Sequence, residues 1–242
     1  MPMYTLFLAL RAALFYLVVS VLVLIFTTLL FVVLPLPFRY GRQQISRGWA
    51  HSITFVGKLI CGMSYQIIGA ENIPKTPVVY LSKHQSAWET MTFTGLLTPN
   101  CFVCKEALLK IPFFGWSMAI CRAIPINRSA GVSAFKKVLS VGKSRLAEGL
   151  SIIIFPEGTR VAPKQHPKFH RTGVTLATSC NVPIIPIAHN SGACWRRNEF
   201  IKRPGLITII IGKAIEQSGK TAEAINQEVH QWMQTQMEQL EK

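Results

Sequence analysis

The first strong pattern in the chain is an uninterrupted apolar run near its N-terminus. Residues 12–38, AALFYLVVSVLVLIFTTLLFVVLPLPF, contain no charged side chain. A helix needs about 20 consecutive apolar residues to cross a bilayer, and this run is longer. A cleaved signal peptide has a basic start, a shorter apolar stretch and a small-residue cleavage site. Here Arg11 is the only early base and the run ends in Pro35 and Pro37, so we expect an uncleaved membrane anchor.

The bases that follow the run indicate which side of the membrane the remaining chain occupies. Arg39, Arg42 and Arg47 come soon after it. Basic residues next to a membrane helix favour the cytoplasmic side. We therefore expect the rest of the chain on the cytoplasmic face, at the inner membrane if the protein is bacterial.

A second helix is predicted for residues 46–63, in which Trp49, Ile53, Val56 and Ile60 recur at helical spacing. Such a helix either lies in the membrane interface with its aromatic and basic residues near the headgroups, or is an ordinary core helix. The spacing favours neither. We assign residues 1–62 to a hydrophobic anchor of one or two helices, and residues 63–242 to one globular domain.

From about Met63 onward, short β-branched runs alternate with amphipathic stretches. The runs predicted as strands are YQIIGA, PVVYLS, CFVC, AIPIN, SIIIF, VPIIPIA and LITIIIG. The main helices are predicted at Ser133–Glu148, Thr172–Cys180 and Thr221–Leu240. Strands that alternate with helices predict a single α/β domain with a mostly parallel or mixed central sheet flanked by helices.

Charge and composition narrow the partners. The chain has 26 Lys and Arg against 11 Asp and Glu, and half of its residues are hydrophobic. A basic protein binds anions, and nucleic-acid binders usually show stacking platforms or basic helices that are not found here. Of an anionic membrane surface, a phosphorylated substrate and nucleic acid, high hydrophobicity with positive charge favours the membrane surface, and no nucleic acid is expected. The six cysteines suggest neither a disulfide framework nor a zinc pattern, and His166 and His170 lack a third ligand nearby, so no metal site is expected.

The stretch KHQSAWET directly follows the predicted strand PVVYLS. Strand ends are where open α/β sheets keep reactive groups. His84 is suited to take a proton near neutral pH, and a carboxylate from Glu89 would fix its tautomer. S-A-W-E is also a helix capping box, in which Glu89 would bond the backbone of Ser86. We expect Ser86 to cap the helix and Glu89 to face His84, on the premise that the carboxylate does not serve both purposes.

Two further stretches place polar side chains at strand ends. FPEGTR follows SIIIF, where Gly158 permits a tight turn, Thr159 offers a hydroxyl and Arg160 a guanidinium. Such a turn suits a phosphate, although a plain surface turn has the same composition. KIPFFGWSMAICRAIPINR puts Arg128 after another strand, where it binds either an anion or a nearby helix.

Together these stretches resemble the sequence blocks of the 1-acyl-glycerol-3-phosphate acyltransferase family. KHQSAWE resembles the block written N-H-Q-S-x-x-D, KIPFFGW…INR the second block, FPEGTR the third and VPIIPIA the fourth. The match covers roughly residues 65–215. Four blocks in order are far more specific than any one of them.

The resemblance implies an activity for residues 63–242. The family moves a fatty acyl group from acyl-CoA or acyl-carrier protein to the free hydroxyl of lysophosphatidic acid, giving phosphatidic acid without a further cofactor or a covalent acyl-enzyme. His84 would be the general base and Glu89 would orient it. The residues implied at the substrate phosphate are Lys105, Arg128, Glu157, Gly158, Thr159 and Arg160.

The chain departs from the family blocks at several positions. Glu89 stands where Asp is usual, Lys83 replaces the common Asn, and Asn127 stands where the second block often has Asp. Where the family often reads F-K-x-G, residues 170–173 read HRTG. These changes affect the acyl acceptor more than the reaction, so the alternative is a related acyltransferase acting on another lysophospholipid or a lyso-aminolipid.

Other classes of protein fit less well. A serine lipase or thioesterase is disfavoured because no G-x-S-x-G nucleophile elbow occurs. A non-catalytic lipid-binding protein would keep the anchor and the basic surface without needing both His84 and FPEGTR.

Overall fold

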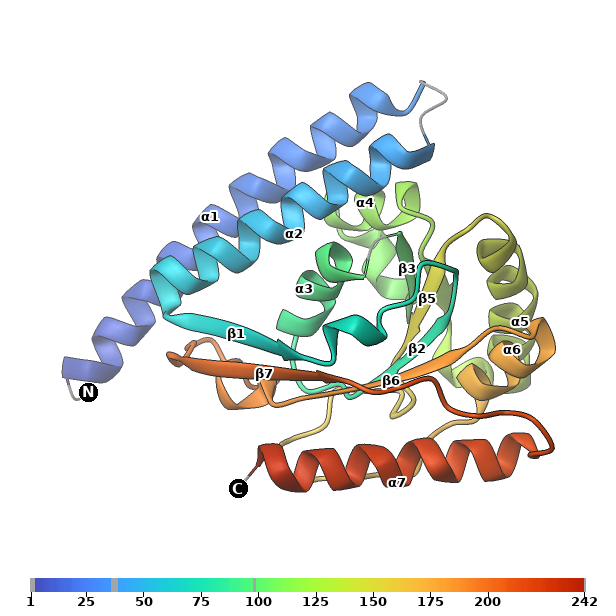
Figure 1. Cartoon of the computed structure of the whole chain (residues 1–242). Coiled ribbons are helices and arrows are strands. Elements are labelled where there is room, and N and C mark those ends of the chain that lie inside the picture. The colour runs from blue at the N-terminus through green and yellow to red at the C-terminus, as the bar shows by residue number, and fades with distance from the viewer. Residues whose placement is uncertain (1–2, 36–38, 98, 242) are drawn as a thin grey trace.

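Helices and strands alternate from residue 63 onward, as predicted. The computed structural model describes residues 3–35, 39–97 and 99–241, and Pro37 of the predicted anchor lies outside them. The helices are α1 (Met3–Val33), α2 (Arg39–Cys61), α3 (Trp88–Leu96), α4 (Phe114–Ile120), α5 (Val132–Ala147), α6 (Thr172–Cys180) and α7 (Ala222–Leu240). The strands are β1 (Met63–Ile68), β2 (Val79–Ser82), β3 (Asn100–Lys105), β4 (Ile124–Ile126), β5 (Ser151–Ile154), β6 (Ile184–His189) and β7 (Gly205–Ile211). Each run predicted as a strand contributes one (Figure 1).

The seven strands form one sheet in the order β1-β7-β6-β2-β5-β3-β4. Neighbouring strands are parallel except for β6 and β7, which are antiparallel. The predicted fold class, a mostly parallel or mixed sheet flanked by helices, is confirmed. The central strands β2 and β5 are buried along their whole length. Burial on both faces explains why their sequences are continuous apolar runs.

Side chains of the central strands alternate between two hydrophobic cores. Val79 and Leu81 of β2 point into the core that contains residues of α5, α6 and α7. Tyr80, between them, points into the opposite core, together with Ile53 of α2 and Phe93 of α3. Figure 1 shows these two groups of helices on opposite sides of the sheet. The period of two in β2 therefore distributes its side chains between both helical layers.

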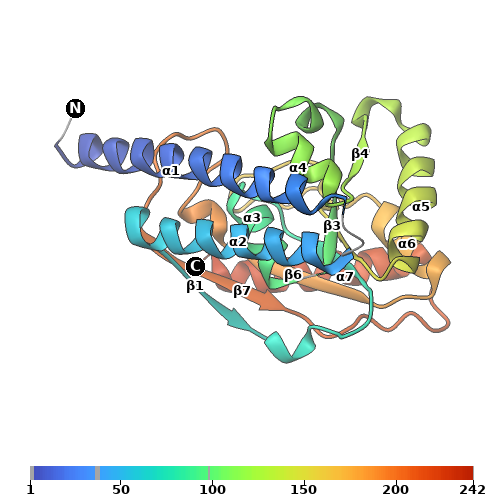
Figure 2. The same ribbon diagram turned by 90° about the horizontal axis from the view of Figure 1, so that it is seen from above.

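Helices α1 and α2 run antiparallel to each other along one side of the molecule, and the first turns of α1 extend past α2 (Figures 1 and 2). Within the described residues, α1 is the one helix long and apolar enough to cross a membrane, by length and composition. It begins earlier than the uncharged run because the Arg11 guanidinium is accommodated, donating to the carbonyl of Ile60 and lying over the Phe7 ring. One face of α1, with Ala12 and Phe15, is buried, and its other faces are largely exposed.

The predicted face of α2 belongs to the core. Ile53 is buried, and Trp49, Val56 and Ile60 pack against the same cluster of side chains. The interpretation of this segment as a core helix is therefore confirmed for these four residues. Leu59, on another face of the helix, is exposed.

Helix α1 is also fixed to the segment between β6 and β7. Phe15 packs edge-on against Trp195 with ring centroids 5.5 Å apart, and Tyr16 stacks on Phe200 at 5.4 Å. The Lys202 ammonium lies over the rings of Tyr16 and Trp195, at 4.7 and 4.6 Å from their centroids. The predicted anchor thus packs on the α/β unit.

Candidate active site

Four predicted site residues lie at one edge of the sheet. His84 follows β2, Lys105 ends β3, Arg128 follows β4 and Arg160 follows β5. These four strands are parallel neighbours in the order β2-β5-β3-β4. Their carboxyl ends meet at the same edge, which is where open α/β sheets place their ligands.

His84 and Glu89 form a hydrogen-bonded pair. His84 Nδ1 lies 2.8 Å from Glu89 Oε1, and the carboxylate is fully buried. The Phe155 ring stacks on the imidazole with centroids 3.9 Å apart and fixes its plane. Because Nδ1 faces a carboxylate, it carries the proton, and Nε2 is left as the basic nitrogen. No described residue hydrogen-bonds to Nε2.

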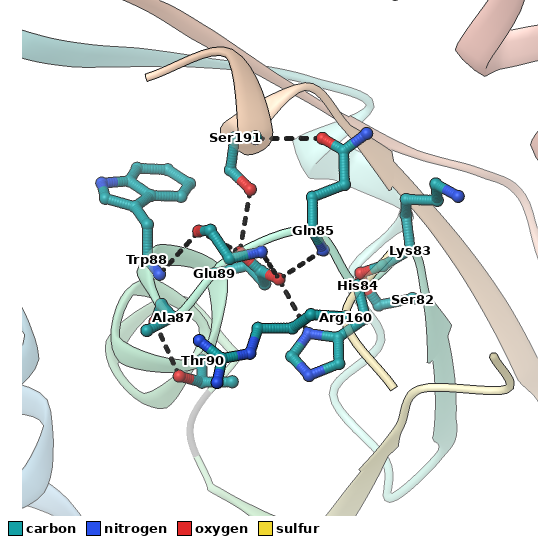
Figure 3. Close-up of polar contacts among 12 residues, drawn as sticks. Ser82, Lys83, His84, Gln85, Ala87, Trp88, Glu89, Thr90, Arg160 and Ser191 are labelled. Atoms are coloured by element: carbon teal, nitrogen blue, oxygen red, sulfur yellow. Dashed lines mark hydrogen bonds and ion pairs between the residues drawn. The ribbon is translucent and has the colours of Figure 1, made fainter. Parts of the chain in front are cut away.

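The Glu89 carboxylate is held through both oxygens. Besides His84, Oε1 accepts from the backbone N–H groups of Gln85 and Ser86 at 2.9 and 2.8 Å. Oε2 accepts from the hydroxyls of Ser86 and Ser191 at 2.7 and 2.8 Å, so the carboxylate lies between Ser191 and the His84 ring (Figure 3). Burial raises the pKa of Glu89, but the neighbouring imidazoles and the hydrogen bonds lower it more, and the pKa lies well below its usual range. Glu89 is therefore ionised at neutral pH and stabilises a protonated His84.

Ser86 and Glu89 also build the start of helix α3. The helix begins at Trp88, and its N-cap residue is Ala87 rather than the expected Ser86, although the backbone N–H of Trp88 donates to Ser86 Oγ at 2.8 Å. The same Glu89 carboxylate that bonds His84 returns to the backbone of Ser86. The premise that it would serve only one of these purposes was wrong. An ionised carboxylate has about four acceptor positions, so one buried group both orders the turn and orients the histidine.

Glu157 is buried beside the backbone of His84. Its carboxylate forms an ion pair with Lys83, and its Oε2 accepts the backbone N–H of His84 at 2.8 Å. The Lys83 ammonium also donates to the carbonyl of Gln165 at 2.8 Å. These partners contact both oxygens of Glu157, and its expected place at the substrate phosphate stays a prediction. Gly158 contributes the turn through its positive φ of 69°.

His84 lies where two cavities meet. The cationic cavity, of about 890 Å³, is lined by His84 and by predicted phosphate-binding residues, namely Lys105, Arg128, Thr159 and Arg160. The apolar cavity, of about 160 Å³, is also lined by His84. Its apolar lining comes from α1, α2, β3 and α4 and includes Phe26, Leu30, Trp49, Phe102 and Met118. His84 thus lies between a place for an anion and a place for a hydrocarbon chain.

Two cations that were not predicted, Lys110 and Arg197, also line the cationic cavity. We call Lys105, Arg128, Arg160 and Arg197 the cavity cations. Among the described residues none of the four forms an ion pair, although Glu106 also lines the cavity. Burial lowers the pKa of Arg128, and the charges of Arg160 and Arg197 lower it further. Guanidinium groups that form no ion pair with a carboxylate suit an anionic ligand such as phosphate.

Two of the departures from the family blocks have partners of their own. The Asn127 side chain accepts from the backbone N–H and hydroxyl of Ser129 at 3.1 and 2.7 Å, so it is not a partner of Arg128. Arg171 forms an ion pair with Glu223 of α7. In the part of the chain that the structure describes, no three His, Cys, Asp or Glu side chains are placed to hold a metal ion.

Comparison with known proteins agrees with this geometry. The acyltransferase family model matches residues 64–190, which is more than half of the chain. The chain belongs to the acyltransferase family. A 1-acyl-sn-glycerol-3-phosphate acyltransferase from Pseudomonas aeruginosa is 39% identical to it over 236 residues, which cover 96% of this chain and 92% of the relative.

A more distant relative and a solved structure extend the comparison. A 1-acyl-sn-glycerol-3-phosphate acyltransferase from Saccharomyces cerevisiae is 27% identical over 202 residues, covering 77% of this chain and 63% of the relative. The crystal structure of the 1-acyl-sn-glycerophosphate (LPA) acyltransferase PlsC from Thermotoga maritima matches with a TM-score of 0.81 and 20% identity. That match covers 98% of this chain and 99% of the solved one. This acyltransferase therefore has the same fold as the solved enzyme.

Sequence reasoning missed functional side chains that follow the fourth block of this acyltransferase. Ser191 bonds Glu89, and the His189 ring contacts the carbonyl of Lys83 through Nε2 at 2.8 Å. Burial lowers the pKa of His189 below its usual range. Both residues follow VPIIPIA at the end of β6, the neighbour of β2. The signal that would have found them is polar residues directly after a buried strand, as in KHQS.

Proposed function

We propose that this protein acylates the free hydroxyl of 1-acyl-glycerol-3-phosphate with a fatty acyl group taken from a thioester, and so produces phosphatidic acid. The observation that carries the proposal is the position of the His84–Glu89 pair between a cationic and an apolar cavity. A lysophosphatidic acid has the matching layout, with a phosphate at one end of its glycerol and a hydrocarbon chain at the other. The acceptor is named in the P. aeruginosa relative, which aligns with nearly the whole chain.

The chemistry begins with proton transfer to His84. Nε2 takes the proton of the substrate hydroxyl as its oxygen attacks the carbonyl carbon of the thioester. The ionised Glu89 stabilises the imidazolium that forms, through the hydrogen bond to Nδ1. When the carbon–sulfur bond breaks, the thiolate takes this proton from Nε2 of His84 and leaves as a free thiol. No acyl group is attached to the protein at any step.

Substrate position accounts for much of the rate. Lys105, Arg128 and Arg160 hold the phosphate, and the apolar cavity accepts hydrocarbon, so the hydroxyl between them is held near Nε2. Holding reacting groups in place removes an entropic part of the barrier. The thioester donor is acyl-CoA or acyl-carrier protein, both acidic partners for a protein of net charge +15. No further cofactor takes part.

We also propose that α1 places the enzyme in a membrane with the catalytic site on the cytoplasmic face. The supporting features are the exposed apolar faces of α1 and the exposed Trp116 of α4, whose ring lies 6.1 Å from that of Phe31. Lysophosphatidic acid is itself a membrane lipid, so this position gives the cavities direct access to substrate. Flotation of the full chain with vesicles containing anionic lipid tests the association.

An acyl-transfer assay tests the reaction. The full chain in detergent receives lysophosphatidic acid and a long-chain acyl-CoA or acyl-carrier protein, and free thiol is followed. We expect thiol release that depends on the lysolipid, and a rate lower by about 10²–10⁴ in His84→Ala. His51→Ala is the matched control, because His51 is exposed on α2 outside both cavities. Unchanged activity in His84→Ala would overturn the mechanism, and thiol release without lysolipid would overturn the acceptor.

A further inference from the structure

Arg197 differs from the two arginines nearest to it in the chain. Arg196 and Arg203 both face the carboxylate of Glu199, Arg196 at 4.0 Å and Arg203 through two hydrogen bonds of 2.6 and 2.5 Å. Arg197 lies between them in sequence but lines the cationic cavity, and it has no carboxylate partner among the described residues. The fold therefore gives both neighbours a carboxylate partner and leaves the Arg197 charge free for a ligand.

The Arg197 guanidinium is held at the cavity by the third block. Its Nη1 donates to the backbone carbonyl of Arg160 at 2.9 Å. The segment that carries it is anchored by Trp195, which is 5% exposed and packs against Phe15. A guanidinium has five N–H donors, and this contact uses one of them. The remaining donors are available beside the side chain of Arg160.

We propose that Arg197 binds the acceptor phosphate together with Arg128 and Arg160, and that it selects a phosphomonoester over a phosphodiester. The inference rests on the proposed function and deepens it. A phosphomonoester has a charge of about −1.5 to −2 at pH 7 and three terminal oxygens. The phosphodiester of a lysophospholipid such as lysophosphatidylglycerol has a single charge and two free oxygens. A third guanidinium therefore gains more from lysophosphatidic acid than from the diester.

The mutual repulsion of the three guanidiniums supports this assignment. The charges of Arg160 and Arg197 both disfavour the charged form of Arg128, in addition to the effect of its burial. A dianion relieves this repulsion more completely than a monoanion. Arg197 also lies outside the third block. A substitution there changes selection of the headgroup without changing a residue of the turn made by FPEGTR.

Steady-state kinetics of the full chain test the proposal. For Arg197→Gln we expect the KM for lysophosphatidic acid to rise on the order of tenfold, with kcat and the donor KM nearly unchanged. The preference for lysophosphatidic acid over lysophosphatidylglycerol falls by a similar factor. Arg197→Lys keeps the charge but not the forked donors. Its KM for lysophosphatidic acid and its headgroup preference are expected to lie between those of wild type and Arg197→Gln. Arg196→Gln is the matched control and leaves all these values unchanged.

Direct binding separates this inference from the proposed function. Calorimetry of lysophosphatidic acid with the protein in detergent, without donor, is expected to give a weaker Kd for Arg197→Gln and an unchanged one for Arg196→Gln. If wild type binds lysophosphatidic acid but does not acylate it, the proposed function fails and the binding role of Arg197 still stands. If wild type acylates it and Arg197→Gln changes neither KM nor Kd, Arg197 is not a phosphate ligand. An equal loss for both headgroups, or a change in the donor KM alone, overturns the selectivity.

Discussion

Two sets of basic side chains in this acyltransferase differ in how their charge is compensated. The inner lysines, Lys83 and Lys202, are each 1% exposed. Lys83 faces the Glu157 carboxylate and the carbonyl of Gln165. Lys202 donates to two backbone carbonyls and lies over two aromatic rings, those of Tyr16 and Trp195. The fold therefore gives each of these ammonium groups partners of its own.

The cavity cations have the opposite arrangement. They lie at strand ends and on the segment after β6, and no described carboxylate forms an ion pair with any of them. Water can solvate these groups in the free protein, so leaving them unpaired costs little stability, whereas an unpaired charge in the interior costs several kcal/mol. This difference distinguishes the charges that stabilise the fold from those that are available to bind a ligand.

The largest expected effect is a loss of stability when one of the inner lysines is replaced. Lys83→Met leaves the Glu157 carboxylate buried without its counter-charge, and it also unpairs the carbonyl of Gln165. Removing one partner of a buried ion pair destabilises by about 3–5 kcal/mol. For a chain of this size we expect the midpoint of thermal unfolding to fall by roughly 10 °C. Thermal melts in detergent measure this shift.

A matched surface lysine serves as the control for Lys83, and a double variant tests whether the loss comes from the uncompensated charge. Lys168→Met changes an exposed lysine and is expected to leave the midpoint nearly unchanged. Adding Glu157→Gln to Lys83→Met removes the uncompensated charge and recovers part of the loss. Equal midpoints for the variants of Lys83 and Lys168 would mean that the buried pair contributes nothing to stability.

A smaller effect of opposite sign is expected at the cavity. Arg128→Gln relieves repulsion with Arg160 and Arg197, and we expect it to raise stability by a few tenths of a kcal/mol, at most about 1. The same change is expected to raise the KM for lysophosphatidic acid on the order of tenfold, because one charged contact to the phosphate is lost. Arg145→Gln is the control, because Arg145 pairs with Glu148 and its loss lowers stability. A clear loss of stability in Arg128→Gln would mean that Arg128, like the inner lysines, has partners in the fold that compensate its charge.

Much of the fold could be predicted because its signals are local. Buried strands are short β-branched runs bounded by turns, and all seven were recognised in this way. Helix α6 has the predicted bounds of Thr172–Cys180. Helix α4 was not predicted, and the residue before it, Phe113, has a positive φ of 60°. That backbone conformation is rare for a bulky residue, and no local pattern indicates it.

The candidate site could be predicted only as far as its residues lie within short motifs. The His84–Glu89 contact spans five residues and follows from a turn between strand and helix. The partner of Lys83 is 74 residues away and the Ser191 contact to Glu89 spans 102. Such contacts depend on strand order, which places β6 and β5 on either side of β2. A single sequence does not determine that order.

The smallest expected effect separates the two sets of charges in one sample. Salt shortens the screening length from about 10 Å at 0.1 M to about 3 Å at 1 M, and it acts on exposed charges far more than on buried pairs. We expect the KM for a short-chain lysophosphatidic acid, kept below its micelle concentration, to rise several-fold between about 0.05 and about 0.5 M NaCl. The melting midpoint is expected to change little, because the Lys83–Glu157 pair is out of reach of the ions. Arg128→Gln has one charge fewer at the cavity, so its KM is expected to depend less steeply on salt. A KM that does not depend on salt in wild type or in Arg128→Gln would contradict an electrostatic role for the cavity cations.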